Sequence, residues 1–421
     1  MKRGGSRAEE QQLMSVLPED SERTRRYRSK RDAILAAATD LVNVNGVRGF
    51  TLADVAQRVG LNTPSVAYYF RKKEDLAAAC LIASMERLNT LVTLAAKGRD
   101  PRERVSLLIE TYFDMRRRIR LGEEPALTSF NEVRAFNEKH GETVSNAYVE
   151  MFRGVRGLLE PATADAAQRR LRNARTRLVM ETMFSAAVIL MNYEPDEFGR
   201  ARRRMTDILL DGLAAPGQAW KPRVIEGVIP TPKDHAEAAR ESFLIAATQL
   251  INEQGYRGAS VEKISAKLNV TKGSFYHYNE AKDDVVVACF ERSLKIIRTI
   301  ERAAAAEENG WARLCAASAA LLKVQVSDQG PILRLSAIGG LPARTELVSQ
   351  FDRISDRFAA VISEGIADGS VRPVDPIIAA HMFTSMINSA AGLPAWLPGI
   401  TPAEAPAIYA KPLLMGLFPA Q

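Results

Sequence analysis

The 421 residues are enough for several domains with buried cores, and the balance of 46% hydrophobic to 25% charged residues is that of an ordinary soluble chain. The net charge of +7 suits a protein that meets phosphate groups, whereas the three scattered cysteines, Cys80, Cys289 and Cys315, exclude a disulfide framework and a zinc site. No apolar run approaches about 18 residues and no apolar core follows the basic start, so we expect a cytoplasmic protein that does not span a membrane.

The N-terminal part of the chain is polar up to residue 28, and we expect it to be largely disordered. A helix is then predicted over 31–45, because Ile34, Leu35, Ala38, Leu41 and Val42 recur at helical spacing on one face. Gly46 is expected to end this helix, because glycine adopts the left-handed backbone conformation of a helix C-terminus without strain.

Two short helices are predicted next. Thr51 is a good N-cap for a helix over 52–59, with Asp54 as its capping-box partner. Gly60 allows a sharp turn, and Asn62 or Thr63 then caps a third helix that tolerates Pro64 in its first turn. A short helix, a tight turn and a second short helix form the helix-turn-helix, whose second helix enters the DNA major groove.

The chain repeats itself at an offset of 209 residues. Residues 29–80 align with 238–289 without a gap, and sixteen of these 52 pairs are identical. Residues 212–234 lie between the copies and hold four prolines, which predicts an extended, semi-rigid linker. The chain is therefore predicted to contain two copies of one unit.

The stretches TLADVAQRVGLNTPSVAYYFRKKEDL and SVEKISAKLNVTKGSFYHYNEAKDDV resemble the N-terminal DNA-binding domain of TetR-family transcriptional regulators. The resemblance covers about 50 residues in each copy and implies a three-helix DNA-binding domain followed by a helical domain for ligand binding and dimerisation. We therefore expect an all-α fold with a basic disordered tail (1–28), a first helix-turn-helix domain (29–80), a first regulatory domain (81–211), a linker (212–234), a second helix-turn-helix domain (235–289) and a second regulatory domain (290–421).

Each copy departs from the family pattern. The first has Pro64 where the family prefers glycine and Ala67 where it prefers a phosphate-binding tyrosine. The second keeps Gly273 and Tyr276 but has Asn279 where phenylalanine is usual. The two recognition helices are therefore expected to prefer different half-site sequences.

The expected DNA contacts combine hydroxyls and cations that bind phosphates with side chains that read base edges. Thr51 and Ser260 can act as N-caps and as phosphate donors at once, and Tyr69 can pack in the core or contact DNA. Lys73 and Lys282 lie at a helix start, where the helix dipole does not favour a cation, which favours a phosphate contact over simple solvation. The predicted contacts are Thr51, Thr63, Ser65, Tyr68, Tyr69 and Lys73 in the first copy and Ser260, Thr271, Lys272, Gly273, Tyr276, His277 and Lys282 in the second.

The basic segment 21–31 is either a solvated charge run or an arm along the DNA backbone or minor groove. In the regulatory domains, aromatic and methionine side chains predict an apolar pocket for a small apolar or acyl effector, with ordinary core packing as the alternative for each residue. The pocket candidates are Tyr112, Phe113, Phe130, Tyr148, Phe152, Met183, Phe184, Trp311, Phe358, His381, Met382, Phe383 and Met386.

The four histidines lack metal-ligand spacing, and the sequence contains no nucleophile elbow, P-loop or dinucleotide fingerprint, so we expect no enzyme, no metal and no cofactor. We expect a ligand-responsive repressor in which the two copies form an intramolecular pseudo-dimer on an imperfect palindrome of double-stranded DNA; two chains could also pair further. The alternatives are a ligand-independent architectural DNA-binding protein, or a helical enzyme or scaffold with a decayed motif.

Overall fold

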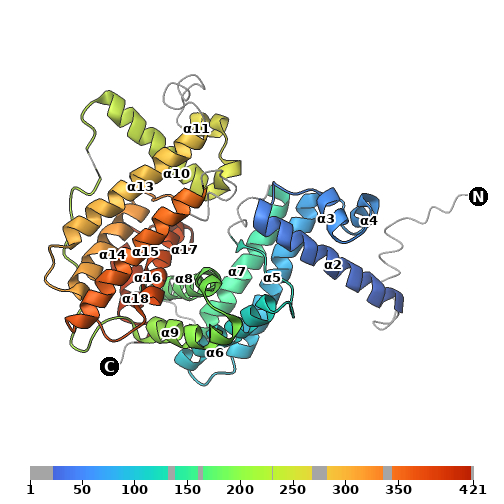
Figure 1. Ribbon diagram of the computed structural model, residues 1–421, viewed down its shortest axis with the longest axis horizontal. Coiled ribbons are helices and arrows are strands. Elements are labelled where there is room, and N and C mark those ends of the chain that lie inside the picture. The colour runs from blue at the N-terminus through green and yellow to red at the C-terminus, as the bar shows by residue number, and fades with distance from the viewer. Residues whose placement is uncertain are drawn as a thin grey trace, which may run out of the picture. The chain divides into compact units, whose positions relative to one another are not determined.

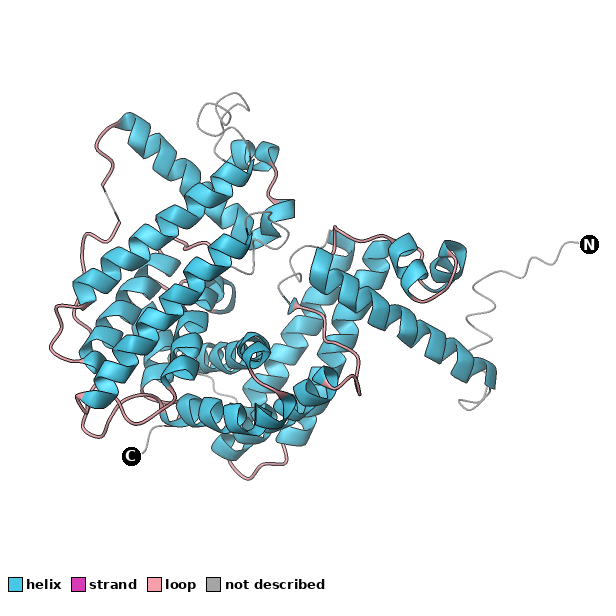
Figure 2. Ribbon diagram, viewed as in Figure 1, coloured by secondary structure: helices cyan, strands magenta, loops and turns pink. Residues whose placement is uncertain are grey.

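The computed structural model describes residues 22–130, 138–159, 165–229, 231–267, 282–334 and 344–418. Every regular element within these ranges is helical, and an isolated antiparallel bridge joins Ala214 to Val371 (Figures 1 and 2). The expected all-α fold is confirmed. The chain divides into two compact units, the first made of Met1–Ser84 and Pro125–Val144 and the second of Met85–Glu124 and Ser145–Gln421.

The first unit contains the first three-helix segment. It consists of α2 (Glu22–Asn45), α3 (Leu52–Arg58) and α4 (Thr63–Tyr69), the start of α5 (Lys73–Ala95) and the start of α7 (Glu138–Leu159). Ile34, Val55 and Val66 are fully buried in its core, which also includes Ala38 and Val42 as the helical period predicted. Leu41 lies at the edge of this core and is only partly buried.

Local sequence sets the bends of this unit. Gly46 ends α2 with a φ of +70°, and Gly60 adopts a φ of +65° between α3 and α4, as expected. The Thr51 side chain accepts a hydrogen bond from Asp54 N, and the Asp54 carboxylate accepts one from Thr51 N at 2.8 Å, which completes the predicted capping box. Asn62, rather than Thr63, caps α4.

The basic tail requires a correction, because residues 22–28 belong to α2 rather than to a disordered segment. Thr24, Tyr27, Arg31 and Ile34 continue the helical spacing, with Thr24 buried and Tyr27 half-buried. This stripe of buried and half-buried side chains runs through a segment in which most residues are charged. The helix therefore begins nine residues before the predicted start at residue 31.

The second unit holds the remaining helices of both copies. Those of the first copy are α6 (Pro101–Arg120), α8 (Ala166–Ile189), the turns η2 (Leu190–Asn192) and η3 (Pro195–Glu197), and α9 (Phe198–Asp211). Those of the second are α10 (His235–Gly258), α11 (Val261–Lys267), α13 (Lys282–Ala304), α14 (Gly310–Val326), α15 (Arg344–Ala367), α16 (Pro376–Ser389), η5 (Ala390–Gly392), α17 (Leu393–Trp396), η6 (Pro406–Ala410) and α18 (Lys411–Leu414).

Helices from the two copies pack against each other inside the second unit. α13, α14, α15 and α16 lie side by side, and α8 of the first copy packs on α16, α17 and η6 of the second (Figure 1). α9 also contacts α16 and α18. The terminal helices that the repeat places at equivalent positions are thus the ones that touch.

The repeat extends beyond the aligned 52 residues. α5 and α13 have bounds that differ by 209, as do the starts of α6 and α14, which follow the N-caps Asp100 and Asn309. The thiols of Cys80 and Cys289 donate to equivalent backbone oxygens, Leu35 O and Leu244 O, at 3.5 Å. The two copies therefore share local structure down to single hydrogen bonds.

The linker shows no helix in its described residues and packs along the second copy. Leu213 N donates to Leu414 O at 2.7 Å, Arg372 N donates to Leu213 O at 3.0 Å, and Trp311 Nε1 donates to Ala219 O at 3.0 Å. These contacts fix the linker on α14 and the C-terminal segment, so it is part of the folded unit rather than a spacer.

Candidate nucleic-acid interface and effector region

The first recognition helix, α4, packs one face on the core of its domain and exposes the other. Asn62 Oδ1 accepts a hydrogen bond from Ser65 N at 2.9 Å, and the fully buried Val66 fixes the helix to the core. Thr63 and Tyr68 are exposed, whereas Ser65 and Tyr69 are half-buried. The four predicted reading residues of this copy thus come together on one short helix.

Three tyrosines form a cluster at the end of α4. The Tyr27 ring lies 4.8 Å from Tyr69 and 6.4 Å from Tyr68, and the two α4 rings are 5.3 Å apart. Burial, followed by the proximity of Tyr27 and Tyr68, raises the pKa of Tyr69. Sequence reasoning missed Tyr27, although its helical spacing with Thr24 and Ile34 could have revealed that α2 continues to this ring.

The predicted phosphate ligands of the first copy have partners in their own domain. The Thr51 hydroxyl donates to Asp54 Oδ2 at 2.8 Å, and Lys73 Nζ donates to Arg48 O at 3.0 Å. Arg71 and Lys72 beside Lys73 are exposed, as are Arg23, Arg25, Arg26, Arg28 and Lys30 on the first turns of α2. Exposed cations thus neighbour Tyr27 along α2 and closely follow Tyr69 in the sequence.

The second copy shows a different environment for its lysine. Lys282 Nζ lies 4.3 Å from the centre of the Tyr256 ring, whose hydroxyl donates to Asp283. Burial lowers the pKa of Lys282. Ser260 Oγ accepts a long hydrogen bond of 3.4 Å from Lys263 N at the start of α11. The other predicted contacts of this copy, Thr271, Lys272, Gly273, Tyr276 and His277, lie outside the described residues.

The predicted effector residues fall into separate groups. Tyr112 and Phe113 of α6 and Met183 of α8 are buried, and Phe184 is half-buried. Trp311 is buried by the linker contact, and Phe358 packs on Phe383 with ring centres 4.5 Å apart beside Met382, Met386 and the half-buried His381. Phe130 is half-buried and belongs to the first unit.

Two effector candidates lie at the contact between the copies. The Phe152 ring stacks on Trp396 of α17 at 4.1 Å, and Tyr148 lies 5.6 Å from the same indole. Because Tyr148 and Phe152 come from α7 and Trp396 from the second copy, these three rings join the two regulatory domains. Their positions are those of an interface between copies.

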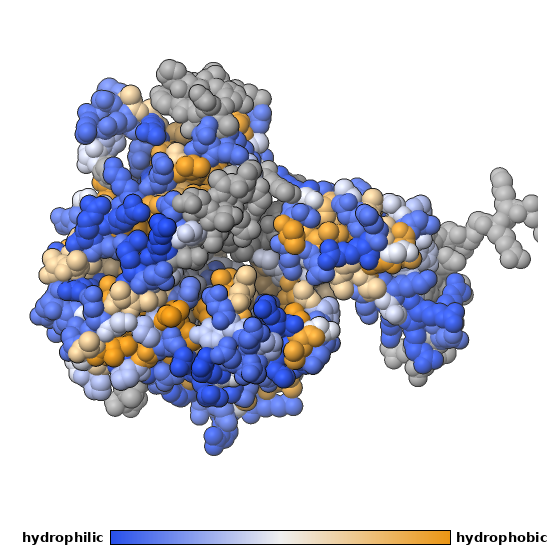
Figure 3. Space-filling view, in the orientation of Figure 1, coloured by the Kyte–Doolittle hydropathy of each residue, from blue (hydrophilic) through white to orange (hydrophobic). Residues whose placement is uncertain are grey.

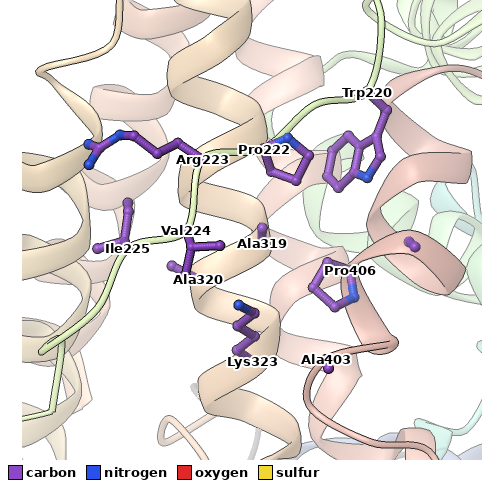
Figure 4. Close-up of a pocket in the computed structure, with 11 residues that line it drawn as sticks. Trp220, Pro222, Arg223, Val224, Ile225, Ala319, Ala320, Lys323, Ala403 and Pro406 are labelled. Carbon is purple, nitrogen blue, oxygen red and sulfur yellow. The ribbon is translucent and has the colours of Figure 1, made fainter.

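A small pocket of about 160 Å³ lies between the linker and the second copy (Figure 4). Trp220, Pro222 and Val224 of the linker cover it, and Ala319, Lys323 and Pro406 form part of its other wall. None of the predicted effector residues lines this pocket, so it is distinct from the expected apolar site.

The described residues contain no group of three or more histidine, cysteine or acidic side chains that could hold a metal ion. In the same residues, α5 has the length and hydropathy of a membrane-spanning helix, but half of its apolar window is buried in the protein, as in a core helix. Hydrophilic residues cover most of the face shown in Figure 3, and the hydrophobic ones form small separate patches.

Comparisons with known proteins agree with the repeat. Residues 34–80 and 243–289 both match the family "Bacterial regulatory proteins, tetR family", and residues 307–392 match "Tetracyclin repressor-like, C-terminal domain". The chain is 32% identical over 143 residues to the HTH-type transcriptional repressor DhaR of Mycobacterium sp. (strain GP1), a match that covers 32% of this chain and 70% of DhaR.

The Transposon Tn10 TetC protein of Escherichia coli is 24% identical over 144 residues, which cover 34% of this chain and 73% of TetC. Among solved structures, apo AibR and AibR in complex with isovaleryl coenzyme A and operator DNA both match at 20% identity, with TM-scores of 0.36 and 0.35. Each match covers 42% of this chain and 98% of the AibR chain. The sequence matches confirm the resemblance drawn from the two motifs: this chain belongs to the tetR family of bacterial regulatory proteins, contains the family's DNA-binding module twice, and is a DNA-binding regulator of transcription.

Proposed function

We propose that one chain acts as an intramolecular pseudo-dimer and represses transcription in the cytoplasm by binding an imperfect palindrome. The observation that supports this most directly is the packing of α8 and α9 on α16, α17, η6 and α18, helices of equivalent position in the two copies. Ion pairs between the copies accompany this packing, namely Arg170 with Glu404 at 3.3 Å, Arg372 with Asp207 at 2.8 Å, and Arg204 with Asp375.

The two recognition helices are proposed to read different half-sites. The first carries Pro64 and Ala67 and is supported from behind by Tyr27, whereas Ala236 occupies the position equivalent to Tyr27 in the second copy. The Tyr27 ring packs on Tyr69 in the first copy, and the second copy has only the methyl group of Ala236 at the equivalent position. This difference, together with Gly273 and Tyr276, supports unequal half-sites.

Phosphate contacts are proposed for Thr51, Lys73, Ser260 and Lys282. Lys73 would exchange its hydrogen bond to the neutral Arg48 O for an ion pair with a phosphate, which adds the attraction between opposite charges. Lys282 Nζ lies over the Tyr256 ring and burial lowers its pKa, so the second copy is expected to make the weaker of the two clamps.

An apolar or acyl effector is proposed to bind among the aromatic and methionine side chains of one or both regulatory domains. The stack of Phe152 on Trp396 would let effector binding in one copy change the other, because a shift of α7 that moves Phe152 also moves α17. A ligand that binds better to the conformation in which the spacing of the recognition helices does not match the DNA half-sites would release the DNA.

Selection and sequencing of genomic fragments bound by the purified protein tests the proposal, with the mass of the complex measured on one selected fragment. We expect one chain on one imperfect palindrome. A strictly symmetric site that binds more tightly than every asymmetric one would contradict unequal readers, and a sequence-blind affinity with a steep salt dependence would indicate an architectural protein.

A double variant, Lys73→Ala with Lys282→Ala, tests the clamps on the same fragment. Loss of two phosphate contacts should weaken binding and flatten the salt slope by about 1.8, because each neutralised phosphate contributes about 0.9. Lys295→Ala on α13 is the control, because Lys295 is exposed and lies more than three helical turns beyond the start of that helix. An unchanged affinity of the double variant would favour a scaffold with a decayed motif.

A further inference from the structure

The pocket of about 160 Å³ under the linker owes its space to small side chains on α14 (Figure 4). Ala319 and Ala320 line it and precede Lys323, a third lining residue, by one helical turn, so the three share a face of the helix. Both alanines are buried. Their methyl groups leave room that longer side chains would fill.

Hydrogen bonds hold the linker in place at this pocket. Trp311 Nε1 donates to Ala219 O at 3.0 Å, and Arg223 donates to Ala303 O at 2.8 Å and pairs with Glu307. The linker residues that line the pocket follow Ala219 in the sequence. Because protein hydrogen bonds hold this wall, a molecule that binds here would need to order little of it, which favours affinity.

The third wall of the pocket is η6. Pro406 and the exposed Ala407 line the pocket from this side. Residues Pro406–Ala410 wind as a π-helix, a rare form that is frequent at functional sites. The same turn packs on α8 of the first copy. A molecule in the pocket would therefore contact an element that takes part in the packing between the copies.

Two cations line the pocket, and they differ in their partners. Arg223 pairs with Glu307, whereas Lys323 Nζ forms no hydrogen bond or ion pair with any residue that the structure describes. Lys323 is half-buried, and the remaining lining residues are apolar. Apolar walls favour a hydrocarbon group, and the ammonium favours one negative charge beside it.

The equivalent face of the first copy has a different character. Helices α6 and α14 start 209 residues apart, so Glu110 takes the place of Ala319. The Glu110 carboxylate pairs with Arg202 of α9 at 2.6 Å, and α9 packs along α6. Asp114 takes the place of Lys323 and reverses its charge. The small residues and the cation of the pocket are thus features of the second copy.

We infer that this pocket binds a small monocarboxylate with a short apolar chain. Its carboxylate pairs with Lys323, and its chain lies between the alanines of α14 and the linker. A cavity of about 150 Å³ admits benzene, so a pocket of this size suits about six to eight non-hydrogen atoms. The site is separate from the aromatic and methionine side chains proposed to hold an effector. The inference therefore goes beyond the proposed function and does not rest on DNA binding.

Isothermal titration of the full-length protein with butyrate, in the absence of DNA, tests this site. Butyramide is the matched neutral probe, because it has the same number of non-hydrogen atoms. We expect one butyrate to bind per chain, and butyramide to bind about tenfold more weakly because it carries no charge. Lys323→Gln should weaken butyrate binding by about tenfold and change butyramide binding less.

Lys411→Gln is the matched control, because Lys411 is exposed at the start of α18 and does not line the pocket. It should leave butyrate binding unchanged. Ala407→Leu should weaken the binding of both probes, because a larger side chain at the exposed rim takes up part of the space. Thermal unfolding of each variant checks that it is folded.

Three results would overturn the inference. They are the absence of saturable butyrate binding, equal affinities for butyrate and butyramide, and an unchanged butyrate affinity in Lys323→Gln. The last result would also follow if butyrate bound among the regulatory side chains instead. None of these outcomes depends on whether the protein binds the selected genomic fragments, so the proposed function is tested separately.

Discussion

Tyr27 ties the N-terminal turns of α2 to the recognition helix of the first DNA-binding domain. It extends α2 by packing on Tyr69, and it supports the helix that carries the exposed Tyr68. Aromatic pairs of this kind contribute about 0.5–1.5 kcal/mol beyond the area they bury. The segment that looked like a solvated charge run is therefore also part of the domain's structure.

Tyr27→Ala should lower the free energy of unfolding by about 1 kcal/mol and also weaken DNA binding, because Tyr69 loses the ring behind it. Tyr68→Ala should weaken DNA binding with a smaller loss of stability, because the Tyr68 side chain is 45% exposed. Thermal unfolding and titration of the selected DNA fragment measure the two effects. Equal stability losses for the two variants would contradict the supporting role of Tyr27.

The thiols of Cys80 and Cys289 occupy equivalent sites, and burial raises the pKa of each to about 11. At pH 8 the thiolate fraction is then about two orders of magnitude below that of an ordinary cysteine. Labelling by a thiol reagent should be correspondingly slow in the folded protein and fast in denaturant, with mass spectrometry to assign each site. Rapid labelling of either thiol under native conditions would show that its domain opens readily.

At the scale of elements, the turn between α3 and α4 depends on backbone conformation rather than on space. Gly60 has a φ of +65°, and a Cβ atom added there would meet nothing within 4 Å. Gly60→Ala should therefore cost about 1–2 kcal/mol of stability from strain alone. Gly157→Ala, in open space within α7, should instead stabilise the protein by about 0.5–1 kcal/mol, and denaturant unfolding compares the two. Effects of the same sign would contradict the conformational explanation.

The elements that sequence could predict are those specified by local chemistry. The helical period of Ile34, Ala38 and Val42, the caps Thr51 and Asn62, and the φ of Gly60 all act within a few residues. What could not be predicted depends on contacts between distant segments. The start of α2 needs the Tyr69 ring, the path of the linker needs the Trp311 indole, and Phe152 meets Trp396 only once the copies pack.

At the scale of the whole molecule, the ends of the two copies pack on each other within one chain. The linker contributes to this contact rather than simply spanning it, because Gly212 passes so close to the C-terminal segment that a Cβ atom would lie 2.4 Å from Gly416 N. The main-chain bonds from Leu417 N to Leu209 O and from Phe418 N to Leu210 O continue the contact. The end of α9, the start of the linker and the end of the second copy thus form a single folded region.

Cutting the linker tests whether that region holds the copies together without the covalent bond. A protease recognition sequence inserted after Gly227, which is exposed and has open space around its Cα, should allow cleavage without disturbing the fold. The two halves should remain associated in native mass spectrometry, because α8 and α9 still pack on α16, α17 and α18. Trp396→Ala in the cleaved protein should promote their separation, since the indole stacks on Phe152 at 4.1 Å. Halves that separate at once after cleavage of the otherwise unchanged chain would show that the linker, and not the helical interface, maintains the pseudo-dimer.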